Sequence, residues 1–192
     1  MQRRVFLIHG WEGRPDNHWF PWLSWELKAR GFAVHALTMP HSEAPKVSEW
    51  IGAIKAAVGR PTAATYFVGH SIGCQAILRY LESLPEKAKI GGAIFVAGWL
   101  DLANLETPEE KEIAKPWIET PIDFKKAKSH CPKFTTIFSD NDKYAPMARS
   151  LEFQKALGAK AVLERGKGHF TKDEGVVALP SVFKSLMAIS PS

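Results

Sequence analysis

The chain has 192 residues, of which 45% are hydrophobic and 23% are charged. This length and composition are typical of one globular domain, and they exclude a disordered, collagen-like or coiled-coil chain. The formal net charge of +5 is not gathered in a basic segment with interleaved aromatic residues, so we expect no nucleic-acid partner.

In chain order, short apolar runs alternate with segments of helical spacing. The predicted strands lie at 5–8, 33–37, 65–68, 93–96, 135–138 and 161–163, and the predicted helices at 19–28, 47–58, 72–84, 146–157 and 176–187. Each apolar run has the length of a strand that is buried on both faces. The alternation predicts an α/β fold, with a mostly parallel sheet of about six strands and helices on both faces. Functional residues of such sheets gather at the carboxyl ends of the strands.

Residues 99–132 interrupt this alternation. The segment carries Pro108, Pro116 and Pro121, with short helical pieces at 109–115 and 124–129. A connection of this length is a candidate lid or pocket wall, and the alternative is a surface excursion without a role. No repeat or linker divides the chain, so residues 1–192 are interpreted as a single domain.

The cysteines and the N-terminus bear on location. Cys74 and Cys131 lack the spacing of a metal site, and a secreted protein would more often carry a deliberate bridge, which favours a reducing, cytoplasmic location. Arg3 and Arg4 precede the apolar run 5–8, which is too short for a signal peptide or a membrane span. We therefore expect no membrane association.

The strongest motif surrounds Ser71. The sequence Gly69-His70-Ser71-Ile72-Gly73 follows a predicted strand and opens a predicted helix, which is the context of a nucleophile elbow. A turn sharp enough to expose Ser71 above the sheet strains the backbone, and glycines at the flanking positions remove side chains that would clash. The alternative is an ordinary glycine-rich turn.

A nucleophilic serine needs a histidine base. Of the two histidines that follow Ser71, His130 lies within the irregular segment, whereas His169 lies in the loop after the last predicted strand. That loop begins at a carboxyl strand end, so His169 is the predicted base.

The base needs an acid, and the chain order in this fold is Ser, then Asp or Glu, then His. Asp142 lies in the loop after the strand at 135–138 and is the predicted acid. Asp140 in the same loop is interpreted as a turn or capping residue. Asp101, which follows the strand at 93–96, remains a rival for the acid.

Two backbone N–H groups are expected to form the oxyanion hole. Ile72 follows the nucleophile and supplies the first, while the loop after the first strand supplies the second, with Trp11 as the predicted donor. His9 in that loop is interpreted as structural support.

The chain contains seven tryptophans. Trp22 and Trp25, in the first predicted helix, are expected to pack in the core. Trp11 and Trp99 follow strand ends, so they are the candidates for the apolar wall of a substrate pocket.

Several motifs resemble a known family, the small serine hydrolases related to retinoblastoma-binding protein nine, with the bacterial YdeN-type members. The motifs are His9-Gly10-Trp11, His18-Trp19-Phe20-Pro21-Trp22-Leu23, Met39-Pro40, Gly69-His70-Ser71-Ile72-Gly73-Cys74, Asp140-Asn141-Asp142 with Pro146, and Gly168-His169-Phe170. The resemblance covers nearly the whole chain.

The resemblance implies a compact α/β-hydrolase without a large cap domain. It also implies a Ser-Asp-His triad at Ser71, Asp142 and His169, and no metal or organic cofactor. Binding to retinoblastoma protein is not implied, because no Leu-x-Cys-x-Glu stretch surrounds Cys74 or Cys131.

These observations predict a serine hydrolase of the carboxylesterase class (EC 3.1.1) that cleaves small-molecule esters by two-step acyl transfer. The alternatives are an amidase or aminopeptidase-like hydrolase, a lyase on the same scaffold, and a protein-binding module with weak catalysis.

Overall fold

The computed structural model describes residues 2–190, in which strands and helices alternate as the sequence predicts. In chain order the elements are β1 (Arg4–Ile8), α1 (Phe20–Ala29), β2 (Ala33–Leu37), α2 (Val47–Val58), β3 (Thr65–His70), α3 (Ile72–Glu82), β4 (Gly92–Val96), α4 (Pro108–Glu119), α5 (Phe124–His130), β5 (Phe134–Ser139), α6 (Met147–Leu157), β6 (Lys160–Glu164) and α7 (Pro180–Ile189). No helix in this range is long and apolar enough to cross a membrane.

The strands form one sheet in the order β2-β1-β3-β4-β5-β6, and every neighbouring pair is parallel. From β1 the chain moves outward to β2 and then returns to β3 on the other side of β1. The strand order therefore reverses between β1 and β3. Ligands bind at such a reversal in open α/β sheets, in the crevice at the carboxyl strand ends.

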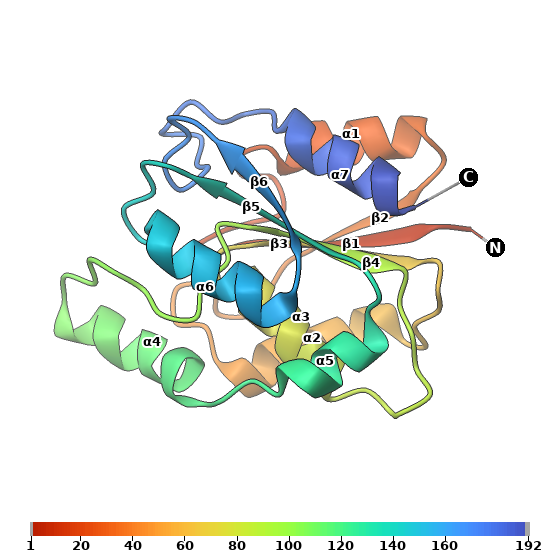
Figure 1. The fold of residues 1–192 in the computed structure, drawn as a ribbon, viewed down its shortest axis with the longest axis horizontal. Coiled ribbons are helices and arrows are strands. Elements are labelled where there is room, and N and C mark those ends of the chain that lie inside the picture. The colour runs from red at the N-terminus through yellow and green to blue at the C-terminus, as the bar shows by residue number, and fades with distance from the viewer. Residues whose placement is uncertain (1, 191–192) are drawn as a thin grey trace.

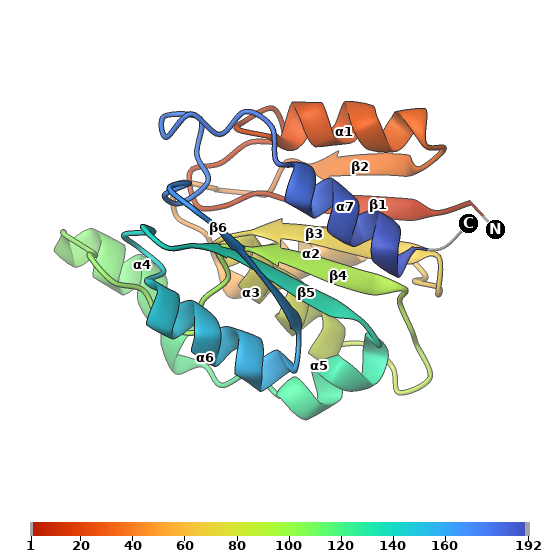
Figure 2. The same cartoon turned by 45° about the horizontal axis from the view of Figure 1, so that its top comes forward.

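Helices cover both faces of the sheet (Figures 1 and 2). α1 and α7 lie on one face, and α2, α3, α5 and α6 lie on the other. Alternate residues of β1 enter the two cores: Phe6 and Ile8 pack beneath α2 and α3, whereas Val5 and Leu7 pack beneath α1 and α7. Burial on both faces explains the apolar runs of the inner strands, whereas the edge strands β2 and β6 are only partly buried.

The last helix begins later than its sequence pattern suggests. The predicted helix spans 176–187, but α7 starts at Pro180. Leu179 has φ −137° and ψ 80°, because the ring of a following proline disfavours the helical conformation for the residue before it. The proline itself fits the first helical position, where no N–H donor is required.

The predicted core position of Trp25 is wrong. Its side chain is 68% exposed, whereas Leu23 and Leu27 of the same helix are fully buried. Trp22 is half-buried and packs against the core beneath α1 and α7. The buried face of α1 is formed by Leu23 and Leu27, so Trp25 lies on the face that points to solvent.

Residues 99–132 are folded against the body of the protein. Thr107 and Glu110 form a capping box at the start of α4. Trp117 is buried against Trp50, and its Nε1–H donates to the carbonyl of Pro45. Arg79 of α3 donates to the carbonyl of Trp117 as well. Figure 1 shows α4 at the end of the molecule to which the carboxyl ends of the strands point.

Candidate active site

The turn between β3 and α3 places Ser71 in a strained conformation. Its φ is 53° and its ψ is −122°, values that an L-residue rarely adopts. A Cβ atom at Gly73 would lie 2.5 Å from the carbonyl oxygen of Ile8, and one at Gly69 would lie 2.9 Å from the backbone nitrogen of Cys74. The turn thus tolerates only glycine at both flanking positions, as expected of a nucleophile elbow.

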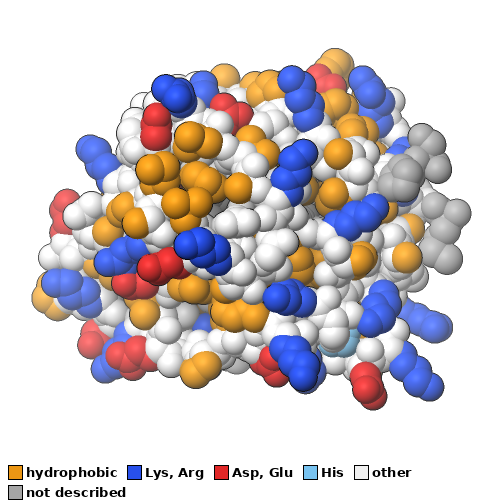
Figure 3. All heavy atoms as spheres, viewed as in Figure 1, with side chains coloured by type: hydrophobic (Ala, Val, Ile, Leu, Met, Phe, Trp, Pro, Cys, Tyr) orange, Lys and Arg blue, Asp and Glu red, His pale blue; other side chains and the backbone are white. Residues whose placement is uncertain are grey.

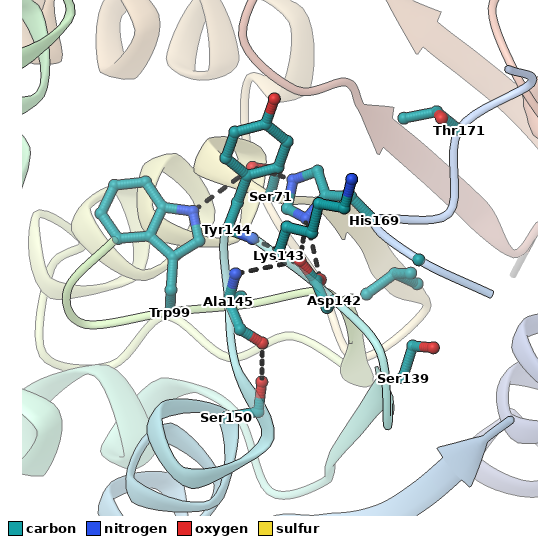
Figure 4. A network of polar contacts seen from close by, with 12 residues as sticks. Ser71, Trp99, Ser139, Asp142, Lys143, Tyr144, Ala145, Ser150, His169 and Thr171 are labelled. Carbon is teal, nitrogen blue, oxygen red and sulfur yellow. Dashed lines mark hydrogen bonds and ion pairs between the residues drawn. The ribbon is translucent and has the colours of Figure 1, made fainter. Parts of the chain in front are cut away.

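Three side chains from three strand ends are joined by hydrogen bonds at this turn (Figure 4). The Oγ of Ser71 lies 2.9 Å from Nε2 of His169, and Nδ1 of His169 lies 2.8 Å from Oδ2 of Asp142. A carboxylate only accepts, so Nδ1 carries the proton and leaves Nε2 free to accept the Ser71 hydroxyl proton. The three residues are 7%, 9% and 6% exposed, respectively. This arrangement can activate a serine hydroxyl as a nucleophile.

Backbone donors fix the Asp142 carboxylate. Its Oδ1 accepts the N–H groups of Tyr144, at 2.9 Å, and Ala145, at 3.0 Å. The rival residues lie elsewhere: Asp101 pairs with Arg149, and Nδ1 of His130 donates to the carbonyl of Ala88. Of the acids considered from the sequence, Asp142 is therefore the one that contacts His169.

The loop that carries His169 is tied to the loop that carries Asp142. Oδ1 of Asp140 accepts the N–H of Gly166 at 2.8 Å, so this side chain joins the two loops, a contact that its interpretation as a turn or capping residue did not include. Oδ1 of Asn141 accepts the N–H of Gly168 at 2.8 Å and the hydroxyl of Ser139 at 2.7 Å. Sequence analysis missed this role for Asn141. The available signal was an amide side chain between two aspartates at a strand end.

The loop after β1 lies against the nucleophile. A Cβ atom at Gly10 would lie 3.4 Å from the Cβ of Ser71. Within residues 2–190, the backbone N–H groups of Trp11 and Ile72 donate to no carbonyl. Both groups remain candidates for the oxyanion hole, as predicted from the sequence.

The two tryptophans predicted to line a pocket differ in exposure. Trp99 is fully buried, and its Nε1–H points at Oγ of Ser71 over 3.3 Å, so it offers no open apolar wall in this structure (Figure 4). Trp11 is half-buried, with Nε1–H bonded to the carbonyl of Glu43. Sequence analysis missed Tyr144, which is 46% exposed and has its ring 5.2 Å from that of His169.

His70, the residue before the nucleophile, supports the loop of the base. Its Nε2–H donates to the backbone carbonyl of His169 at 2.7 Å, and within residues 2–190 its Nδ1 has no partner. Burial, assisted by the neighbouring His169, lowers the pKa of His70 well below its usual value. The imidazole is therefore neutral.

His9 also has a structural place. Its Nδ1–H donates to the carbonyl of Gly10, and its Nε2 accepts the N–H of Met39. Burial lowers the pKa of His9, so it too is held neutral. In the described part of the chain, no group of three or more His, Cys, Asp or Glu side chains is placed to hold a metal ion.

Comparison with known proteins agrees with this geometry. The family model described as serine hydrolase matches residues 5–188. YdeN of Bacillus subtilis is 32% identical over 187 residues, which cover 97% of this chain and 95% of YdeN. Serine hydrolase RBBP9 of Rattus norvegicus is 26% identical over 157 residues, or 81% of this chain and 80% of the relative.

Solved structures show the same fold. The crystal structure of the ydeN gene product from B. subtilis superposes with a TM-score of 0.90 over 98% of both chains, at 30% identity. Est1E from Butyrivibrio proteoclasticus superposes with a TM-score of 0.74 over 98% of this chain and 88% of its own, but at 15% identity it shows the fold alone. The resemblance noted in the motifs is thus confirmed, and the chain belongs to the serine hydrolase family.

Proposed function

We propose that this serine hydrolase cleaves small carboxylic esters, with Ser71 as nucleophile, His169 as base and Asp142 as acid. The observation that carries the proposal is the unbroken hydrogen-bond chain from the Asp142 carboxylate through His169 to the Ser71 hydroxyl. Esters are favoured over amides because the alcohol is the better leaving group.

In the first half of the reaction, Oγ of Ser71 attacks the ester carbonyl carbon while Nε2 of His169 takes the hydroxyl proton. The N–H groups of Trp11 and Ile72 donate to the oxyanion of the tetrahedral intermediate. The intermediate collapses as His169 passes its proton to the departing alcohol oxygen, which leaves an acyl group on Ser71. Asp142 stabilises the transient imidazolium.

In the second half, water attacks the acyl carbonyl and gives a proton to His169. The C–O bond to Ser71 then breaks, Oγ regains the proton, and the carboxylic acid leaves. The reaction consumes one water and needs no cofactor. The ring of Tyr144 lies beside that of His169, and Trp11 follows Gly10, which approaches Ser71. We assign Tyr144 and Trp11 to the wall that an apolar acyl or alcohol group meets.

A fluorophosphonate probe tests the nucleophile, because a base-activated serine beside an oxyanion hole reacts quickly with this electrophile. We expect labelling of the wild type and none of Ser71→Ala. Asp142→Asn should lower ester turnover by a factor on the order of 10³ or more. Asp101→Asn is the matched control and should retain activity; a crippled Asp101→Asn would overturn the choice of acid.

Matched esters and amides of acetate, butyrate and decanoate separate the remaining candidates. Faster cleavage of the short esters supports the proposal, whereas faster cleavage of the amides indicates an amidase or aminopeptidase. Labelling of Ser71 without turnover of any substrate would favour the binding module. We also propose a cytoplasmic location, which the free thiols of Cys74 and Cys131 support and which cell fractionation tests.

A further inference from the structure

β6 is an edge strand with one side open. It pairs with β5, and in the described part of the chain no strand lies on its other side. Lys160, Ala161 and Leu163 are exposed, and Leu163 is 45% exposed. The unpaired N–H and C=O groups of such a strand are a template for another strand.

Two hydrogen bonds show which backbone groups face outward. The carbonyl of Lys160 accepts the hydroxyl of Thr136, and the carbonyl of Glu164 accepts the N–H of Asp140, so both point toward β5. Backbone groups alternate in direction along a strand. The N–H and C=O groups of Ala161 and Leu163 therefore point away from the sheet.

Apolar side chains flank this open edge. Val162 packs in the core beneath α7, so Ala161 and Leu163 project from the opposite face, on which α6 lies. Met147 and Leu151, one turn apart on α6, are 43% and 36% exposed. Arg149 of α6 pairs with Asp101, in the loop after β4, so its side of the helix faces β4. Met147 and Leu151 lie on the opposite side of α6 and therefore face the β6 edge.

The space-filling view shows this apolar surface. Figure 3 has hydrophobic side chains gathered where Figure 1 has β6 and the first turns of α6. We define the edge surface as Met147, Leu151, Ala161 and Leu163. Contiguous apolar surface of this kind on a soluble protein commonly marks an interaction site.

We propose that the edge surface binds a second copy of this chain, with the two β6 strands antiparallel about a two-fold axis at Val162. In this register Ala161 of each copy lies opposite Leu163 of the other, and their outward groups form two pairs of N–H···O=C bonds. Lys160 of each copy lies opposite Glu164 of the other. The positive end of β6 in one copy thus meets the negative end of β6 in the other, so the strand is complementary in charge to a second copy of itself.

The charges also specify the register. A shift of the strands away from Val162 separates Lys160 from Glu164 of the second copy and leaves outward backbone groups unpaired. The paired sheets are continuous, and the two α6 helices lie on the same face, where Met147 and Leu151 cover the junction. Because the strands are antiparallel, the carboxyl ends of the two sheets point in opposite directions, so each Ser71 remains accessible.

Sedimentation equilibrium over a wide range of protein concentration tests the proposal. Wild type should associate to a dimer. Lys160→Glu sets two glutamates opposite each other, Glu164→Lys sets two lysines opposite each other, and each change should raise the dimer Kd about tenfold or more. The double variant K160E/E164K restores complementary charges and should regain the wild-type Kd.

Lys125→Glu on α5 is the matched control, since it makes the same charge change on an exposed residue away from β6. It should dimerise as wild type does. Ester hydrolysis should remain unchanged in every variant, because none of these side chains contacts Ser71. Thermal unfolding of the variants should match that of wild type at protein concentrations low enough for all of them to be monomeric. A monomeric wild type, single variants with unaltered Kd, or a double variant that stays as weak as the single ones would each overturn the proposal.

Discussion

Replacing Asn141 with alanine should loosen the loop that carries His169 without removing any reacting atom. Oδ1 of Asn141 accepts the N–H of Gly168, the residue directly before the base, at 2.8 Å. It also accepts the hydroxyl of Ser139 at 2.7 Å, and Oγ of Ser139 in turn accepts the N–H of Lys167 at 3.0 Å. The alanine variant loses the acceptor at the centre of this network.

The cost follows from the number of bonds and their exposure. Asn141 is exposed, so water replaces part of what is lost, and each bond contributes about 1 kcal/mol. The free energy of unfolding should fall by about 1–2 kcal/mol. Because His169 is then held less firmly opposite Ser71, kcat should fall by roughly tenfold to a hundredfold, while KM changes little.

Urea unfolding gives the stability change, and initial rates on a butyrate ester give kcat and KM separately. Asn141→Asp is the matched control, because it keeps an Oδ1 acceptor of the same shape and should retain most of the stability and turnover. Wild-type kcat in Asn141→Ala would refute a positioning role. Equal losses of stability and kcat in both variants would show that the Oδ1 acceptor is not what positions the loop of His169.

Gly73→Ala should destabilise the protein by about 1–3 kcal/mol or more, because its Cβ would meet the backbone oxygen of Ile8. Gly52→Ala, in open space on α2, should instead stabilise the protein by about 0.5–1 kcal/mol. Similar urea midpoints in the two variants would contradict this prediction. Trp99→Phe removes the donor to the nucleophile but keeps most of the ring, so kcat should fall about 3- to 10-fold with the fold retained, and an unchanged kcat would refute this role. Trp99→Ala should also lose about 3–5 kcal/mol of stability, measured by the same unfolding assay. The pKa of His70 is lowered from 6.5 in the folded state, so between that lowered value and 6.5 the unfolded chain binds a proton that the folded one does not. Stability should therefore decline as pH falls below about 6.5, by up to about 1.4 kcal/mol per pH unit, and unfolding curves of His70→Gln should decline less steeply than those of wild type.

Much of the fold could be predicted from the sequence because its signals are local. A strand buried on both faces requires consecutive apolar residues, and the runs at 5–8 and 93–96 satisfy that requirement without reference to distant residues. The elbow is local as well, since Gly69 and Gly73 flank Ser71 within one turn. Chain order then left His130 and His169 as bases, and the position of His169 after the last strand favoured it, while a few aspartates remained as acids.

The direction of side chains and the contacts between distant residues could not be predicted from such local signals. Asp101 and Asp142 both follow strand ends in the sequence, and only the folded chain pairs one with Arg149 and the other with His169. Trp99 was predicted to face a pocket, but its indole turns inward toward Ser71. The exposure of Trp25 likewise depends on which side of α1 meets the sheet.

The sequence by itself determined the elements and the residue types available for chemistry, because spacing and backbone geometry are local properties. Which side chains meet was decided by the tertiary structure, because those contacts join residues far apart in the chain, and packing selects among rotamers and loop paths that the sequence leaves open.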